Sequence, residues 1–108
     1  MLSYQQFTDL LSIARQHNQY DKFVFAAGKY ISDPSDRTLD IAWRMKYAHL
    51  NIKSIRSVAQ LTQAEFAEKY GVSKRSVESW EGGQRRPPEY LVSLLAYAVY
   101  SDTVSEYE

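Results

Sequence analysis

Two pairs of basic residues, Lys74-Arg75 and Arg85-Arg86, are the features of this sequence whose chemistry is most specific. Residues 53–90 carry seven basic and five acidic side chains, whereas residues 91–108 carry three acidic side chains and no basic one. Basic side chains placed close together create a local positive field, which the zero net charge of the whole chain conceals. For each pair taken alone, ordinary solvated surface charge remains an alternative interpretation.

The residues that usually perform catalysis or bind metals are not arranged for either task. The only histidines, His17 and His49, do not lie at metal-ligand or catalytic-triad spacing. The chain has no cysteine, which excludes disulfides, cysteine-ligated metals and a thiol nucleophile. Four glutamates recur at helical spacing, and helix capping and ion pairing are more plausible roles for them than acid–base catalysis; they are Glu65, Glu68, Glu78 and Glu81. No glycine and closing acid of a calcium loop accompany Asp33, Asp36 and Asp40, and no phosphate-binding glycine loop occurs. We expect no catalytic activity, no metal and no cofactor.

The composition is that of a single globular domain. The chain has 108 residues, of which 44% are hydrophobic and 24% charged, with thirteen basic and thirteen acidic side chains. A chain of this length buries enough surface to fold without a metal or a disulfide. The first residues lack the basic start and apolar run of a secretory signal, and no stretch approaches the ~20 apolar residues that span a bilayer. We therefore expect a cytoplasmic protein without membrane contact.

Three helices are predicted in residues 1–51. Ser3 and Gln6 have the spacing of a capping box, which predicts a first helix over about 4–17. Asp21 is expected to cap a second helix that ends at the turn-forming residues 32–36, around Pro34. A third helix is expected from Leu39 to Leu50, with Asn51 as its terminator. These helices are expected to pack on the rest of the chain as one unit.

Short helices with clear boundary signals are predicted after residue 51. The first covers 52–59; the second covers about 63–70, with Thr62 and Glu65 as a capping box and Gly71 in the left-handed conformation after its end. Ser73 is expected to cap a helix over 74–81, in which Val77 and Trp80 face the core. A last helix follows Pro87-Pro88 over about 88–100, and the acidic tail 101–108 is expected to fray. Because no segment alternates apolar and polar residues over the length of a strand, the expected fold class is all-α.

The segment 52–100 resembles a known family. The run Leu61-Thr62-Gln63-Ala64-Glu65-Phe66-Ala67-Glu68-Lys69-Tyr70-Gly71-Val72-Ser73, followed by Val77, Trp80-Glu81 and Gly83, is similar to the lambda-repressor-like helix-turn-helix of Cro- and XRE-type bacterial and phage regulators. The core of the resemblance covers about 20 residues. It implies a helix-turn-helix bundle over 52–100, with about three additional N-terminal helices packed on it in residues 1–51. It also implies that helix 74–81 enters the major groove of double-stranded DNA.

The resemblance implies specific roles for several side chains. Gln63 matches a phosphate-contacting position, although helix capping alone would also explain a polar residue there. Arg75 is the first choice for reading a base, and Lys74 suits either a base or a phosphate. Phosphate contact is the expected role of Arg85 and Arg86. The complete set of expected DNA-binding residues is Gln63, Ser73, Lys74, Arg75, Ser76, Ser79, Arg85 and Arg86.

The last predicted helix is apolar nearly all round, so both of its sides must be covered. The helix-turn-helix would cover one side, and either the N-terminal helices or a second protomer would cover the other. A homodimer is expected for a second reason, because proteins of this type place two recognition helices about one DNA turn, ~34 Å, apart on a two-fold site.

Two functions of different classes are compatible with these features. The leading hypothesis is a sequence-specific transcriptional regulator, and more specifically a repressor, that binds an inverted-repeat operator. The alternative is an antitoxin or phage-encoded inhibitor that binds a protein partner through residues 1–51 and uses the helix-turn-helix for autoregulation. The aromatic residues of that segment would suit such an interface, although core packing is the more common role of such residues.

Overall fold

A computed structural model of the protein describes residues 2–28, 36–45 and 51–105, except for the side chains of residues 36 and 37. The described residues form seven α-helices and no strand, so the predicted all-α class is confirmed. In chain order the helices are α1 (Tyr4–Gln16), α2 (Tyr20–Gly28), α3 (Asp36–Met45), α4 (Ile52–Ala59), α5 (Gln63–Tyr70), α6 (Lys74–Glu81) and α7 (Glu89–Ser105). None of these helices is long and apolar enough to cross a membrane.

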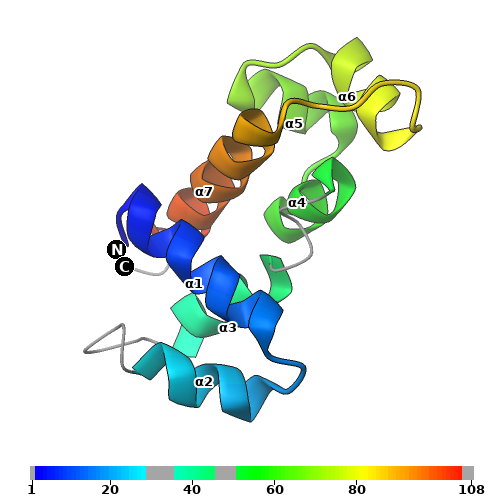
Figure 1. Ribbon diagram of the computed structural model, residues 1–108. Helices are drawn as coiled ribbons and strands as arrows, with labels where there is room; N and C mark the ends of the chain where they lie inside the picture. Colours follow the sequence, from blue (N-terminus) through cyan, green and yellow to red (C-terminus); the bar gives the residue numbers. More distant parts are fainter. Residues whose placement is uncertain (1, 29–35, 46–50, 106–108) are drawn as a thin grey trace.

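The long helix α7 runs through the middle of the molecule (Figure 1). It packs against α4 on one side and against α1 and α3 at its C-terminal end. Of the two alternatives that the sequence left open, the N-terminal helices therefore cover at least this part of α7. Helices α5 and α6 lie at one end of the molecule and α2 at the other (Figure 1). Leu2 ties the start of the chain to α7, because its N–H donates to Tyr100 at 3.0 Å and its carbonyl accepts from Tyr97 at 2.7 Å.

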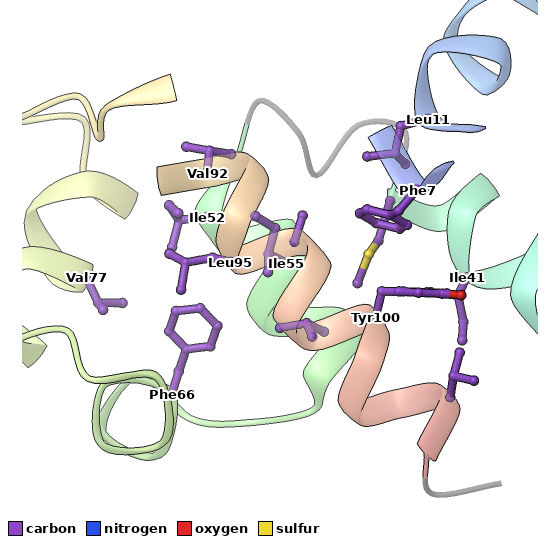
Figure 2. Packing of buried hydrophobic residues seen from close by; sticks show 14 of the residues in the cluster. Phe7, Leu11, Ile41, Ile52, Ile55, Phe66, Val77, Val92, Leu95 and Tyr100 are labelled. Carbon is purple, nitrogen blue, oxygen red and sulfur yellow. The ribbon is translucent and has the colours of Figure 1, made fainter. Parts of the chain in front are cut away.

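The main hydrophobic core joins the two halves of the chain. Phe7 of α1 stacks on Tyr100 of α7 with ring centroids 4.6 Å apart, and both side chains are fully buried. Figure 2 shows Phe66 of α5 and Val77 of α6 directed at the same core, which continues through α4 and α7. A second, smaller core lies among α1, α2 and α3 and contains Leu10, Ala14, Phe23, Ala27, Leu39 and Ala42.

Several predicted helix boundaries are confirmed. Ser3 and Gln6 form the expected capping box of α1, and the predicted helix 52–59 is α4. Helix α7 begins one residue later than expected, with the carbonyl of Pro88 accepting from the N–H groups of Leu91 and Val92. The predicted ends of the second and third helices, and most of the turn between them, fall on residues 29–35 and 46–50, outside the described residues.

Three predictions about boundaries are wrong. Asp21 does not cap α2, because the helix begins at Tyr20 and Asp21 lies in its first turn. Asp36 does not belong to the turn before the third helix, because it is the first residue of α3. Asn51 is the N-cap of α4 and accepts from the N–H of Lys53 at 2.8 Å, and its predicted role in ending the third helix falls on residues 46–50, outside the described residues. The tail does not fray from residue 101, because α7 continues to Ser105 with Val104 buried. Tertiary contacts extend α7, since the hydroxyl of Tyr70 donates to Asp102 at 2.9 Å.

Candidate nucleic-acid interface

The pair of helices α5 and α6 has sharply defined ends. Thr62 accepts from the N–H of Glu65 at 3.1 Å, and the Glu65 carboxylate accepts from the N–H of Thr62 at 2.8 Å, which completes the predicted capping box. Gly71 ends α5 with φ 71°, in the left-handed region where glycine is favoured. Ser73 then caps α6 by accepting from the N–H of Ser76 at 3.0 Å. Local side chains therefore fix the angle at which α6 leaves the turn.

A partly buried ion pair fixes α6 against α4. Arg56 donates from Nε and Nη2 to the two carboxylate oxygens of Glu81 at 2.7 and 2.8 Å, and its Nη1 donates to the carbonyl of Leu61 at 3.0 Å. The side chains of Arg56 and Glu81 are 19% and 7% exposed, respectively. The hydrogen bonds from Arg56 lower the pKa of Glu81, while burial opposes that shift. Such a bidentate pair fixes orientation as well as distance.

Gln63 belongs to the same network. Its side-chain Nε2 donates to Glu81 at 3.2 Å, and the residue is only partly exposed at the first position of α5. The sequence predicted a contact between Gln63 and phosphate or a role in capping. The structure places its amide between α5 and the C-terminal end of α6, where it supports the ion pair.

The first turns of α6 carry the predicted basic and hydroxyl side chains on the outside. Lys74 and Arg75 are exposed, and Lys74 Nζ lies 3.6 Å from the carboxylate of Glu78. Ser76 and Ser79 are partly exposed, and the hydroxyl of Ser73 donates to that of Ser76 at 2.7 Å. This face is polar and rich in donors that suit phosphate oxygens and the edges of bases. Val77 is on the opposite face and fully buried, as predicted, whereas Trp80 is only partly buried against the core.

The loop between α6 and α7 brings Arg85 next to Arg75 of α6. The carbonyl of Ser79 accepts from the N–H groups of Gln84 at 3.0 Å and Arg85 at 3.4 Å, so the loop folds back onto α6. Arg75 and Arg85 consequently line one hollow of about 620 Å³, with residues of α6 and Gln84 forming the rest of its wall. Arg85 and Arg86 line an adjoining groove of about 690 Å³. The structure thus gathers Ser73, Arg75, Ser76, Ser79, Arg85 and Arg86 on one continuous surface.

Sequence reasoning missed one basic residue of this surface. Arg15, in the last turn of α1, lines the groove together with Arg85 and Arg86. No signal in the sequence links it to the loop, because about seventy residues separate the two. Two of the predicted residues line neither the hollow nor the groove. Lys74 lies beside the hollow, and the side chain of Gln63 is directed at Glu81, at the C-terminal end of α6.

Other possible sites are less well formed. No group of three or more possible metal-ligating side chains occurs in the part of the chain that the structure describes. His17 ends α1 as its C-cap, and His49 lies outside the described residues. A small hollow where α3, α4, α5 and α7 meet contains the ion pairs Asp40–Arg44 and Lys69–Asp102, whose charges balance. Comparison of the chain with models of protein families, with curated proteins and with solved structures found no match.

Proposed function

We propose that the protein is a sequence-specific DNA-binding regulator of transcription, with α5, the turn at Gly71 and α6 acting as a helix-turn-helix. The observation that carries the proposal is the exposed N-terminal face of α6, where Lys74 and Arg75 lie on a helix held by the partly buried Arg56–Glu81 pair. A rigid helix that presents basic side chains at its first turns is suited to insertion in the major groove.

Each side chain then has a defined role. Arg75 reads a base, because a guanidinium donates to both acceptors on the edge of guanine. Lys74 binds a base or a phosphate, and the hydroxyls of Ser73, Ser76 and Ser79 supply shorter polar contacts. Arg85 and Arg86 bind phosphates beside the groove. Gln63 acts indirectly through Glu81, and the N-terminal end of α5 faces the DNA backbone.

The proposal includes a homodimer that represses by occupying an inverted repeat. Tyr90 and Leu94 of α7 are 70% and 47% exposed and lie one helical turn apart, so they share a face of that helix. An exposed apolar strip of this kind is costly in water and suits an isologous contact with a second copy. Two copies of α6 would then read the two halves of one operator.

Selection of bound duplexes from a random DNA pool tests the proposal. The purified protein and the variant Lys74→Ala/Arg75→Ala are compared at one fixed salt concentration, because phosphate contacts make affinity salt-dependent. Enrichment of an inverted repeat by the parent and not by the variant is the expected result, and the spacing of the half-sites gives the geometry of the dimer. A folded parent that enriches no sequence would contradict the proposal.

Single substitutions separate base reading from backbone binding. Arg75→Ala should cost about 1–3 kcal/mol on the selected site and relax one base position. Arg86→Ala should weaken binding to selected and random duplexes by the same factor, since a phosphate contact carries no sequence information. The measurement is the ratio of the two affinities for each variant. A changed ratio for Arg86→Ala would mean that the docking geometry is wrong.

A second candidate function is favoured by one observation. Phe25 of α2 is 74% exposed beside a shallow hollow that also involves Ile13 and Ala26, at the end of the molecule opposite α6 (Figure 1). Large exposed aromatics are enriched at protein interfaces. Under this alternative the protein is an antitoxin or phage-encoded inhibitor, and it would retain a stoichiometric partner from its host that a Phe25→Asp variant loses. Recovery of no such partner by the parent would remove this function.

A further inference from the structure

The arginines of this chain divide into two groups. Of the seven in the sequence, six have described side chains. Two of these are held in ion pairs, Arg44 with Asp40 and Arg56 with Glu81. The remaining four form no salt bridge with a described residue, and they are Arg15, Arg75, Arg85 and Arg86. All four line the hollow beside α6 or the groove that adjoins it.

The two depressions form one surface because Arg85 lines both of them. The hollow contains Arg75, and the groove extends from Arg85 and Arg86 to Arg15 on α1. A path of guanidinium groups, none of which forms a salt bridge with a described residue, therefore leads from the candidate recognition helix to the N-terminal helices.

The electrostatics of the groove favour an anion. Of its two carboxylates, Glu81 is already bound by both nitrogens of Arg56, and Glu89 lies in the first turn of α7, where the helix dipole partly offsets its charge. Lys53, next to the lining residue Ile52, lies close enough to Glu81 to help lower its pKa. The three arginines therefore dominate the charge of the groove.

Arg15 is held on a rigid support. Its helix is fixed in the main core by Phe7 and Leu11, both fully buried, and in the smaller core by Leu10 and Ala14. A charged group on an anchored helix loses less conformational entropy on binding than one on a loose terminus.

We infer that Arg15 binds a DNA phosphate, and that the groove lined by Arg15, Arg85 and Arg86 carries the DNA backbone beyond the part contacted by α6. The inference rests on the proposed function and assigns a role to the N-terminal helices in it. These helices lengthen the footprint on each half-site and fix the direction in which the backbone leaves α6, without reading sequence.

The salt dependence of binding tests this inference with Arg15→Gln, the charge-preserving Arg15→Lys and, as a matched control, Arg44→Gln. Arg44 is an exposed arginine of α3 that lines a different hollow. Arg15→Gln should weaken binding to selected and to random duplexes by the same few-fold factor. It should also reduce the slope of log affinity against log salt concentration by roughly 0.9, the value for one lost phosphate contact. Arg15→Lys should restore the slope, and Arg44→Gln should match the parent.

The assay distinguishes the inference from the function on which it rests. If Arg75→Ala lowers affinity for the selected site while Arg15→Gln keeps the parent's affinity and slope, the inference is overturned and the proposed function stands. If the folded parent binds no duplex, both are overturned.

A direct measurement uses the absence of cysteine from the chain. Arg15→Cys introduces a single thiol, to which an iron chelate that cleaves nearby DNA is attached. Cleavage of the backbone outside the bases protected by α6 is the expected result, and Arg44→Cys with the same chelate is the control. Cleavage no stronger than with Arg44→Cys would overturn the inference.

Discussion

The two hydrophobic cores of this protein support different parts of it. The main core fixes α5 and α6, through Phe66 and Val77, to α4 and α7. The smaller core fixes α2 to α1 and α3, largely through Phe23 and Ala27. Only α1 and α3 contribute to both. The candidate DNA-binding helices therefore depend directly on one core. Helix α2, which carries Phe25, the most exposed aromatic residue among those that the structure describes, depends on the other.

The largest effect on stability is expected from the loss of the Phe66 ring, which is fully buried where α5 meets the main core (Figure 2). Phe66→Ala should lower the free energy of unfolding by about 3–5 kcal/mol, because it removes apolar contacts and leaves a cavity. The measurement is the urea midpoint of unfolding. We expect α5 and α6 to lose their fixed geometry and DNA affinity to fall with them.

Phe23→Ala is the matched change in the smaller core, since the ring of Phe23 is also fully buried. It should raise the hydrogen-exchange rates of α2 while α5 and α6 keep their protection, because local unfolding follows cooperative units. Operator affinity should stay close to that of the parent. Loss of DNA binding as complete as in Phe66→Ala would show that the two cores act as one.

The next effect concerns the ion pair that joins α4 to α6. Glu81→Gln leaves the Arg56 guanidinium partly buried without its carboxylate, which should cost on the order of 3 kcal/mol. The pair also predicts acid sensitivity. Hydrogen bonds from Arg56 hold the pKa of Glu81 below the ordinary 4.5, so its contribution to stability is complete above that pH and is lost as the pH falls through the lower, folded-state pKa.

Urea unfolding of the parent and Glu81→Gln from pH 7 to pH 3 measures this contribution. The difference in stability should be constant near neutral pH and shrink below about 4.5. It shrinks because protonated Glu81 carries no charge, like the glutamine that replaces it. A difference that stayed constant to pH 3 would mean that the Arg56–Glu81 pair contributes nothing electrostatic.

The helix ends around α5 and α6 were predictable from sequence, whereas those of the other helices were less so. Thr62 with Glu65, Gly71 and Ser73 each act on a backbone group within a few residues, so their spacing alone identifies them. Asn51 stands between two helical patterns, and its side chain is equally suited to ending one and to beginning the next. The structure shows that it begins α4.

Long-range contacts could not be predicted from spacing. Tyr70 and Asp102 are 32 residues apart, and their hydrogen bond helps α7 continue past residue 100. The partner of Glu81 is 25 residues away, although an ion-pair role for this glutamate was foreseen. The position of Arg15 beside the basic loop depends on how α1 packs, which no local pattern encodes.

A smaller change in stability is expected at the ends of α4 and α5, each of which has a residue in the left-handed conformation. Gln60 has φ 58° and Gly71 has φ 71°, and a Cβ at Gly71 would meet no atom within 4 Å. Gly71→Ala should therefore cost about 1 kcal/mol from backbone strain alone. Gln60→Gly should stabilise by about 0.5 kcal/mol, since glycine is the usual residue at this position. Thermal unfolding measures both, and equal signs would contradict the argument.

The smallest change in stability is expected at the surface pair Lys74–Glu78, whose side chains are 60% and 50% exposed. Glu78→Gln should alter stability by no more than about 0.5 kcal/mol, as for other exposed pairs one helical turn apart. Its effect on DNA affinity should be favourable. Glu78 lines the hollow beside Arg75, so removing its charge frees Lys74 and lowers the repulsion of phosphates.

Affinity for the selected duplex at fixed salt measures this effect, with Glu68→Gln as the control because Glu68 is an exposed carboxylate of α5 that does not line the hollow. Glu78→Gln should bind more tightly than the parent, and Glu68→Gln should do so less or not at all. Equal gains from the two substitutions would mean that only net charge matters. A gain confined to Glu78→Gln would place the DNA against the face of α6 that carries Lys74 and Arg75, on the side of the molecule supported by the main core.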